Sequence, residues 1–237
     1  MSFHLGADGV LRWQPWEEIP WLVHGFSTRG AGDFSPLAEG AGVPTPWDDE
    51  GLRLTWLRQI HSDLLLVDGG DPAAAERPEG DGLLTRQAGL LLGIRTADCL
   101  PLLFVDRRSQ TVSAVHAGWR GTAKRIAARA VETLHREFGV MPSDLEVAVG
   151  PGIGSCCYEV GPEVAGEFDG FVAERDGRPH LDLVSANRAQ LREAGVPAEQ
   201  VRASEMCTAC ATKRFYSYRK EGAQAGRMLA VVGIKPV

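Results

Sequence analysis

Residues 102–139 constrain the fold of this chain more than any other segment. Two short apolar runs, LLFVD at 102–106 and TVSAVHA at 111–117, are separated by a polar stretch, which is typical of a β-hairpin. From 121 to 139, apolar residues recur at helical spacing, and Gly139 stands where a helix would stop. The segment therefore predicts two paired strands followed by a long amphipathic helix.

Apolar runs and helical patterns continue along the rest of the chain. Further strands are expected at 64–68, 90–94, 145–150 and 227–234, and further helices near 162–173 and 182–194. Because strands and helices mix without strict alternation, the predicted fold class is α+β (mixed α/β), with layered mixed β-sheets flanked by helices. The 237 residues show no break in composition, which favours a single domain over residues 1–237. Gly, Pro and acidic residues gather at 31–51 and 69–82, which predicts two long surface loops.

The charge balance argues against one class of partner. The chain has 25 Lys and Arg residues against 31 Asp and Glu residues, a net charge of -6, and no basic run long enough to follow a nucleic-acid backbone. Neither a leader peptide nor a membrane span is expected from the apolar pattern. We therefore expect a soluble cytoplasmic protein that binds neither nucleic acid nor a membrane. Its five cysteines are better explained as thiols, metal ligands or core residues than as a disulfide framework.

The predicted hairpin brings a cysteine towards a histidine. With a two-residue turn at Arg107 and Arg108, Cys99 lies opposite His116. A three-residue turn would move the residue opposite Cys99 by one position. Opposed Cβ atoms lie about 4.5 to 5.5 Å apart, which suits two ligands of one ion. Pro101 cannot donate to the ladder and can end the pairing before Cys99, but the two side chains should remain neighbours. Such a pair is more often core packing than chemistry, so both interpretations stay open.

The turn after His116 has the composition of an anion site. In AGWRGT the chain passes from the second strand into the helix through Gly118, and Arg120 adds a permanent positive charge. Backbone N–H groups at such a helix start, together with a guanidinium, can hold a small anion such as phosphate. The alternative is a tight turn in which Trp119 packs and Arg120 faces water.

Several of these stretches together resemble one known family. They are HGFSTRG at 24–30, QIHSD at 59–63, DGLLT at 81–85, TADCLPLLFVD at 96–106, AVHAGWRGTA at 114–123, GPGIGSCCYEVG at 150–161, and CTAC followed by FYSYRKEG and GR. These stretches cover most of the chain, and they occur in the same order as in the YfiH-type, laccase-domain (polyphenol oxidase-type) family, which the sequence resembles. Its members are described as purine nucleoside phosphorylases with additional deaminase or polyphenol oxidase activities.

The resemblance implies a metal site and a reaction. The family's metal ligands fall on His61, Cys99 and His116, and zinc is the usual occupant, with copper as another candidate. One thiolate and two imidazoles suit zinc, and three ligands leave a fourth position open for catalysis. The implied activity is a zinc-dependent purine nucleoside phosphorylase acting on adenosine, inosine and methylthioadenosine, with an adenosine deaminase activity in addition. A purine nucleoside and phosphate are then its partners.

Residue-by-residue transfer from the family implies further roles around the metal. Arg29 and Arg120 are expected to line the site and, with Gly118, to bind phosphate or substrate. Asp98 could orient a metal-ligating histidine or assist proton transfer, and a helix or turn cap is equally consistent with its position. Residues 31–56 depart from the family pattern, which leaves the substrate-facing rim unassigned.

Other functions remain compatible with the same residues. Cys99 could be a nucleophile activated by His116, in a Cys/His or zinc amidase acting on peptidoglycan precursors. A non-catalytic metal-binding protein is another candidate. A copper-dependent polyphenol oxidase fits less well, because the chain lacks the closely spaced histidines of a multicopper cluster.

The four remaining cysteines give no clear ligand pattern. Cys207 and Cys210 form a CxxC pair, but no second pair or paired histidine follows at the usual distance, so core packing is the interpretation. Cys156 and Cys157 are adjacent, and neighbouring cysteines rarely both bind one ion. We therefore expect them to be structural.

Overall fold

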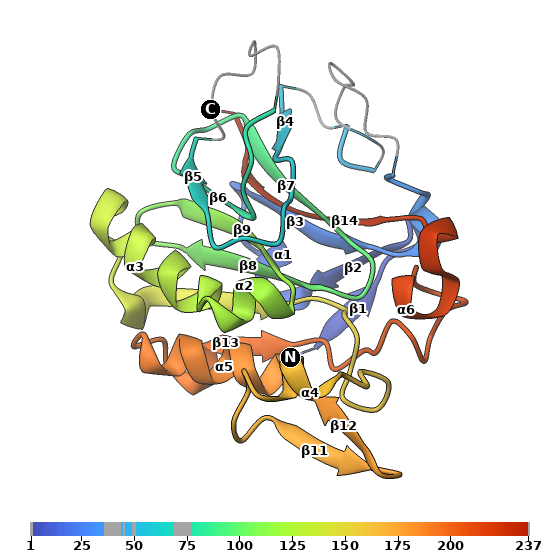
Figure 1. Ribbon diagram of the computed structural model, residues 1–237. Helices are drawn as coiled ribbons and strands as arrows, with labels where there is room; N and C mark the ends of the chain where they lie inside the picture. Colours follow the sequence, from blue (N-terminus) through green and yellow to red (C-terminus); the bar gives the residue numbers. More distant parts are fainter. Residues whose placement is uncertain (1, 36–43, 45, 49–50, 69–76, 237) are drawn as a thin grey trace.

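The computed structural model describes residues 2–35, 44, 46–48, 51–68 and 77–236, and two six-stranded sheets form its centre (Figure 1). The first sheet has the order β1 (Phe3–Leu5), β2 (Val10–Trp13), β3 (Leu22–Ser27), β14 (Met228–Ile234), β7 (Leu90–Thr96) and β4 (Arg53–Trp56). The second has the order β13 (Val201–Ala203), β10 (Leu145–Val149), β8 (Leu100–Asp106), β9 (Thr111–Ala117), β6 (Gly82–Thr85) and β5 (Leu65–Val67). Three neighbouring pairs are parallel, namely β4 with β7, β5 with β6 and β10 with β13. The predicted class of layered mixed sheets is confirmed.

The two sheets pack face to face, and alternate residues of the central strands point into different layers. In β8, Leu103 and Val105 join the apolar layer between the sheets. Leu102 and Phe104 of the same strand face the other way, into the layer shared with the helices. Because both faces of such a strand are buried, its sequence is a continuous apolar run, which is why these strands could be predicted.

Each sheet is covered on its outer face. α3 (Ile126–Phe138) and α5 (Leu183–Glu193) pack on each other and on the second sheet (Figure 1). On the first sheet, Phe34, Trp47 and Trp56 pack against apolar residues of β7 and β14. All strands predicted from apolar runs are present, as is the helix predicted near 182–194.

The helix predicted over 121–139 is wrong as a single element. It is divided into α2 (Trp119–Ala123) and α3, with Arg125 in the left-handed region at φ 64° between them. Two side chains of α5 bind α2 and keep it separate from α3. Asn187 donates to Thr122 Oγ1 at 3.0 Å, and Gln190 donates to the Thr122 carbonyl at 2.7 Å. Gly139 ends α3 in a left-handed conformation, as predicted.

The helix predicted near 162–173 is also wrong for most of its length. Only α4 (Pro162–Ala165) is helical, and the chain then forms a hairpin of β11 (Val172–Arg175) and β12 (Arg178–Leu181). Asp176 and Gly177 both have positive φ at its two-residue turn, the arrangement that an Asp-Gly pair favours. α1 (Gln14–Glu17) and α6 (Tyr218–Glu221) complete the set of described α-helices.

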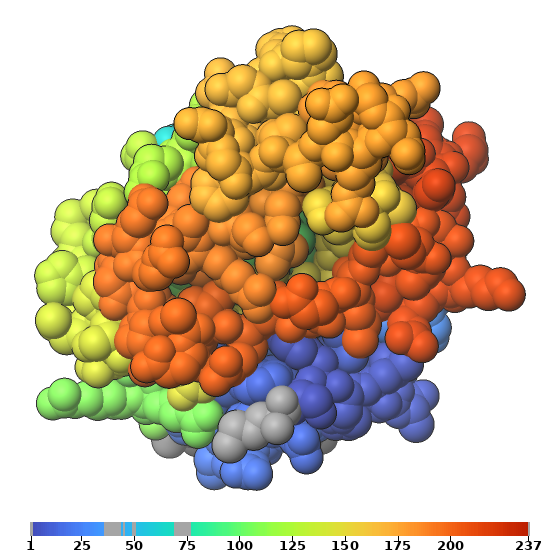
Figure 2. Space-filling model, turned by 90° about the horizontal axis from the view of Figure 1, so that it is seen from below, coloured from blue at the N-terminus to red at the C-terminus, as the bar shows by residue number. Residues whose placement is uncertain are grey.

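The surface seen from below is formed mainly by the segment after β10, coloured yellow to red, with the N-terminal strands in blue at one edge (Figure 2). The predicted loops at 31–51 and 69–82 lie partly outside the described residues. Among the helices that the structure describes, none combines the length and the apolar character needed to cross a membrane.

Candidate active site

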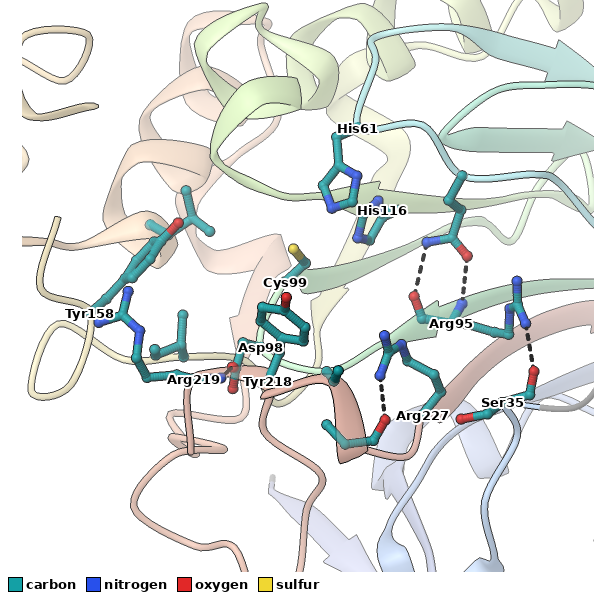
Figure 3. Close-up of a pocket in the computed structure, with 16 residues that line it drawn as sticks. Ser35, His61, Arg95, Asp98, Cys99, His116, Tyr158, Tyr218, Arg219 and Arg227 are labelled. Atoms are coloured by element: carbon teal, nitrogen blue, oxygen red, sulfur yellow. Dashed lines mark hydrogen bonds between the residues drawn. The ribbon is translucent and has the colours of Figure 1, made fainter. Parts of the chain in front are cut away.

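A cavity of about 890 Å³ lies where segments from both sheets meet (Figure 3). Its walls come from the ends of β7 and β9, the turn between β7 and β8, the loops after β4 and β10, and the segment from α6 to the start of β14. His61, Cys99 and His116 lie on one wall, with arginine and tyrosine side chains around them. The cavity therefore brings together residues that are far apart in the sequence.

The structure brings together the three residues that the resemblance implies as metal ligands. His116 lies near the end of β9, Cys99 lies directly before β8, and His61 lies in the loop after β4. One ligand atom from each lies within 4.8 Å of the other two. The two imidazole rings are 4.9 Å apart at an interplanar angle of 76°. One thiol and two imidazoles at this spacing can hold a single tetrahedral cation and leave one position open.

The predicted hairpin exists, but its register differs from both alternatives. The turn has four residues, 107–110, so Asp106 pairs with Thr111 and Pro101 pairs with His116. Cys99 is thus not directly opposite His116 but lies beyond the paired residues, just outside β8. The two side chains remain neighbours, as expected, because the chain curves from Cys99 into the strand beside the end of β9.

Asp81 organises two of the three ligands, and sequence reasoning missed it. It is fully buried at the start of DGLLT, and its Oδ1 lies 2.8 Å from His116 Nδ1. The same carboxylate accepts the backbone N–H of His61 at 3.0 Å, and both the N–H and the hydroxyl of Ser62. Burial raises the pKa of Asp81, but the hydrogen bonds from His116 and Ser62 outweigh it and lower the pKa to about 2. An acidic residue directly before a buried strand was the sequence signal for it.

The thiol and the buried imidazole stabilise each other's charged forms. Burial disfavours a thiolate at Cys99 and an imidazolium at His116. Their mutual attraction and hydrogen bond outweigh this, so the pKa of Cys99 is lowered and the pKa of His116 is raised. Because a metal ion binds the deprotonated thiol, a site that favours the Cys99 thiolate also favours metal binding.

Two residues of the site have a left-handed backbone, which is uncommon outside glycine. His61 has φ 59° and Asp98 has φ 89°. The Asp98 carboxylate accepts the Thr208 hydroxyl at 2.6 Å and the Arg219 backbone N–H at 2.7 Å. Because Arg219 lies in the first turn of α6, Asp98 caps that helix from a distant segment, one of the roles considered for it. The strained turn thus points Cys99 into the cavity while Asp98 fixes the cavity wall.

Gly118 lies against the ligands, and Arg120 does not enter the cavity lining. A Cβ atom on Gly118 would lie 2.9 Å from Cys99 Sγ and 3.2 Å from the His61 ring, so a side chain there would have to displace these residues. Arg120 is exposed, with its guanidinium 4.3 Å from the Trp119 ring. Arg120 thus lies outside the described lining of the cavity, and the anion site expected from AGWRGT stays a prediction.

Arg29 also lies outside the described lining of the cavity, and its expected role in binding phosphate or substrate stays a prediction. Its guanidinium donates to the carbonyls of Thr212 and Phe215, forms an ion pair with Glu221 at 2.6 Å, and lies 4.0 Å from the Tyr216 ring. These contacts hold the chain that leads into α6. Arg29 therefore supports the cavity wall from behind.

Three other arginines, which sequence reasoning did not single out, do line the cavity. Arg219 lies in α6 and donates to the carbonyls of Cys157 and Glu159. Arg95 is the last but one residue of β7 and Arg227 precedes β14, and both side chains lie on the wall away from Tyr158 (Figure 3). Burial and the positive charge of Arg227 lower the pKa of Arg95. Arg95 Nε is buried and has no hydrogen-bond partner among the described residues. Two neighbouring guanidiniums are suited to binding an anion.

Gln59 and two tyrosines complete the cavity. The Gln59 amide exchanges two hydrogen bonds of 2.9 Å with the backbone of Arg95, which fixes the loop carrying His61 against β7. Tyr218 is 56% exposed and lies beside Cys99 in the close-up (Figure 3). Burial, reinforced by the nearby Cys99, raises the pKa of Tyr158, so its hydroxyl keeps its proton. The cavity thus offers both aromatic surface and hydrogen-bond donors.

Comparisons with known proteins show the family of this chain. Residues 47–235 match the family model described as "Multi-copper polyphenol oxidoreductase laccase". A protein from Deinococcus radiodurans named purine nucleoside phosphorylase is 40% identical over 231 residues, covering 90% of this chain and 89% of its own length. Adenosine deaminase RL5, from an unknown prokaryotic organism, is 40% identical over 156 residues, covering 62% of this chain and 59% of its own length. The crystal structure of Bacillus licheniformis YfiH has a TM-score of 0.82 and 29% identity, covering 98% of this chain and 99% of its own.

The donor set of this chain does not match a cluster of several copper ions. The chain has six histidines, and His61 and His116 are those that line the cavity in the described part of the structure. The other four have contacts elsewhere: His4 with Glu17, His24 with the Trp13 N–H, His135 with the Val140 carbonyl and His180 with the Arg178 carbonyl. The residues of the cavity therefore fit one ion rather than several.

Proposed function

We propose, from the premise that this chain belongs to the multi-copper polyphenol oxidoreductase laccase family, that it is a purine nucleoside phosphorylase. In this reaction phosphate attacks the anomeric carbon of a purine nucleoside, the glycosidic C–N bond breaks, and the free base and ribose 1-phosphate are formed. The proposed substrates are adenosine, inosine and methylthioadenosine. Relatives named for this activity support the proposal.

The observation that carries the proposal is the pairing of an anion pocket with the His-Cys-His site in one cavity. Three arginines line the cavity, and two of them, Arg95 and Arg227, place positive charge on the wall away from Tyr158. A doubly charged phosphate would relieve the repulsion between these two guanidiniums.

The ligand set fits zinc. His61, Cys99 and His116 would hold it, and because His116 Nδ1 contacts Asp81, Nε2 is the ring nitrogen left for the metal. When bound there, zinc supplies a Lewis acid with one open coordination position.

The other residues of the cavity bind and orient the substrate. Tyr218 offers an exposed ring on which a purine can stack beside the ligands. Tyr158 keeps its phenolic proton and can donate a hydrogen bond to the nucleoside. Arg95 and Arg227 hold phosphate on the opposite wall, so that nucleophile and nucleoside meet in one orientation.

Replacing Arg227 by glutamine tests the anion pocket. The formation of adenine and ribose 1-phosphate from adenosine is followed at several phosphate concentrations. Loss of one charged contact should raise the KM for phosphate about tenfold or more and change the KM for adenosine little. Arg136→Gln, on the exposed side of α3, is the matched control and should behave like the unmodified protein. An unchanged KM for phosphate in Arg227→Gln would exclude this pocket as the phosphate site.

A second activity at the same site is suggested by the relative named adenosine deaminase. Deamination replaces the amino group of adenosine by the oxygen of water and releases ammonia, so it needs no phosphate. We propose that inosine forms from adenosine in this cavity as well. Inosine that appears without phosphate and disappears in Cys99→Ala would support this, whereas unchanged inosine formation in Cys99→Ala would refute it.

A further inference from the structure

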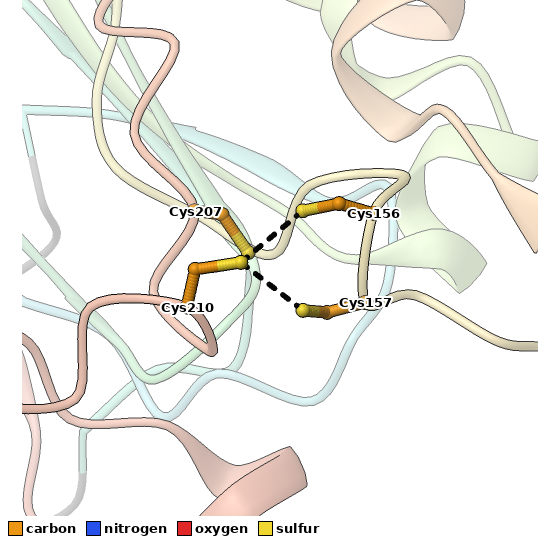
Figure 4. Close-up of side chains that lie close together, drawn as sticks. All are labelled: Cys156, Cys157, Cys207 and Cys210. Carbon is orange, nitrogen blue, oxygen red and sulfur yellow. Dashed lines mark hydrogen bonds between the residues drawn. The ribbon is translucent and has the colours of Figure 1, made fainter.

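The four cysteines outside the cavity converge at one point (Figure 4). Cys156 and Cys157 follow β10, and Cys207 and Cys210 follow β13, so 53 positions separate Cys157 from Cys210. Their four Sγ atoms all lie within 4.8 Å of one another. The neighbours of the CxxC pair thus come from upstream in the sequence, whereas the sequence pattern was searched only downstream.

The exposure of the cluster argues against packing. Cys156 and Cys210 are exposed, and Cys157 and Cys207 are partly exposed. Cysteines that serve as small apolar residues are usually fully buried. Four thiols that converge near the surface need another explanation.

The distances favour a shared ion over a single disulfide. Cys210 Sγ lies 3.4 Å from Cys156 Sγ and 3.3 Å from Cys157 Sγ, so two sulfurs are equally close to it. A disulfide would join one pair and leave two thiols over. In a tetrahedral zinc site with Zn–S bonds of about 2.3 Å, all sulfurs lie about 3.8 Å apart, which is close to this arrangement.

The backbone around the cluster supports thiolates. Gly154 donates its N–H to Cys207 Sγ at 3.2 Å. The N–H groups of Gly154 and Cys210 outweigh burial and lower the pKa of Cys207. In the metal-free protein, burial and the hydrogen bond with Cys210 raise the pKa of Cys156 and raise that of Cys157 to about 11. A Cβ atom on Gly154 would lie 3.2 Å from the Cys207 Cβ and 3.3 Å from Cys156 Sγ, so glycine lets this loop approach closely. N–H bonds to sulfur stabilise the charged form that a metal requires.

The local turn explains how two adjacent cysteines can share one partner. The N–H groups of Cys157 and Tyr158 both bond to the Gly154 carbonyl, at 2.9 and 3.0 Å, so the chain is tightly curled at this point. Both sulfurs then face Cys210 from the same side (Figure 4). This curl removes the objection that neighbouring cysteines rarely bind one ion.

We propose that Cys156, Cys157, Cys207 and Cys210 form a second metal site, a closed tetrathiolate site for zinc. Four protein ligands leave no open position, so this zinc is structural. It joins the loop after β10 to the loop after β13.

The proposed site supports the wall of the cavity. Thr208, between Cys207 and Cys210, donates to the Asp98 carboxylate, and Ile153 donates its N–H to the Asp98 carbonyl at 2.7 Å. Tyr158 follows Cys157 directly, and Arg219 donates to the Cys157 carbonyl at 3.1 Å. Zinc at the four cysteines would thus fix the positions of Asp98 and Tyr158 without touching substrate.

Zinc content of protein expressed with added zinc and purified under reducing conditions tests the proposal. We expect two zinc ions per chain in the unmodified protein and one in each of Cys210→Ser and Cys99→Ser. In their double variant we expect none. One zinc per chain in the unmodified protein that persists in Cys210→Ser would overturn the second site, as would iron in place of the second zinc.

A second measurement needs no variant and is therefore independent of folding defects. The unmodified protein is treated with iodoacetamide before and after zinc is removed with a chelator, and the modified cysteines are identified by peptide mass spectrometry. We expect the exposed Cys156 and Cys210 to be protected until chelation. Immediate alkylation of both, or a disulfide between any two of the four in the reduced protein, would refute the proposal.

Discussion

Asp81 is the residue on which the candidate site most depends, because its carboxylate contacts His116 and the loop of His61 together. In Asp81→Asn one acceptor oxygen becomes an amide donor, which cannot accept the N–H groups around it. We expect zinc affinity at the cavity to fall about 10- to 100-fold, measured by competition with a chelator. Asp144→Asn, at an exposed position, is the control. Equal affinity in both variants would show that Asp81 does not hold the ligands in place.

Gly118 sets how closely the chain passes the ligands. The Cβ atom of Gly118→Ala would lie 2.9 Å from Cys99 Sγ, so either the sulfur or the backbone must move. We expect weaker zinc binding and a lower kcat for phosphorolysis. Gly161→Ala is the matched control, since nothing lies within 4 Å of its added Cβ and its φ is -75°. Gly118→Ala with the zinc affinity and kcat of the control would contradict this contact.

His24 makes the stability depend on pH, away from the cavity. Burial lowers its pKa from 6.5 to about 4, and its Nε2 accepts the Trp13 N–H at 3.2 Å. The folded state thus keeps His24 neutral, and the unfolded chain takes up a proton as the pH falls below 6.5. We expect about 3 kcal/mol of unfolding free energy to be lost between pH 6.5 and 4. In urea titrations His24→Gln should show a flatter dependence in this window, and an identical slope would exclude His24 as the cause.

Only some of the residues of the candidate site could be predicted from the sequence. The hairpin pattern brings Cys99 near His116, because Cys99 directly precedes the first strand of the hairpin and His116 lies near the end of the second. Nothing in the spacing links His61 to them, since its link runs through the buried Asp81. Arg95 and Arg227 could not be distinguished from surface arginines, because only the pairing of β7 with β14 brings them to one cavity.

Among the elements, the central strands could be predicted and several connections could not. Strands buried on both faces appear as continuous apolar runs, whereas β1, β11 and β12 have exposed or half-exposed residues and lack that signal. The break between α2 and α3 comes from tertiary contacts of α5 with Thr122, which helical spacing cannot show. The Asp176-Gly177 pair was a readable hairpin signal that the helical pattern obscured.

The β11–β12 hairpin tests that explanation. Gly177 has φ 73°, and nothing lies within 4 Å of an added Cβ, so Gly177→Ala introduces backbone strain and no clash. We expect the hairpin to lose about 1 kcal/mol of local stability, seen as faster hydrogen exchange of the amides in β11 and β12. In Gly166→Ala, where φ is -65°, exchange should not increase. Unchanged exchange in Gly177→Ala would argue against the strained turn.

For the whole molecule, we propose that the two sheets fold as one unit. The apolar layer between them contains residues of both sheets, including Phe26 and Ile94 from the first and Leu103 and Val112 from the second. Neither sheet can lose its partner without exposing this layer. In excess zinc, we expect tryptophan fluorescence and far-ultraviolet circular dichroism to report one coincident unfolding transition. Two separate transitions would show two independent units.

The function belongs to the whole molecule as well, because both sheets contribute to the cavity. The most direct measurement is the incubation of the purified protein with adenosine, with and without phosphate, beside Cys99→Ala, followed by chromatographic separation of the products. We predict adenine and ribose 1-phosphate only when phosphate is present, and neither in Cys99→Ala. Adenosine left intact by the zinc-loaded protein, or equal activity in Cys99→Ala, would contradict the proposal that this cavity is a phosphorylase site.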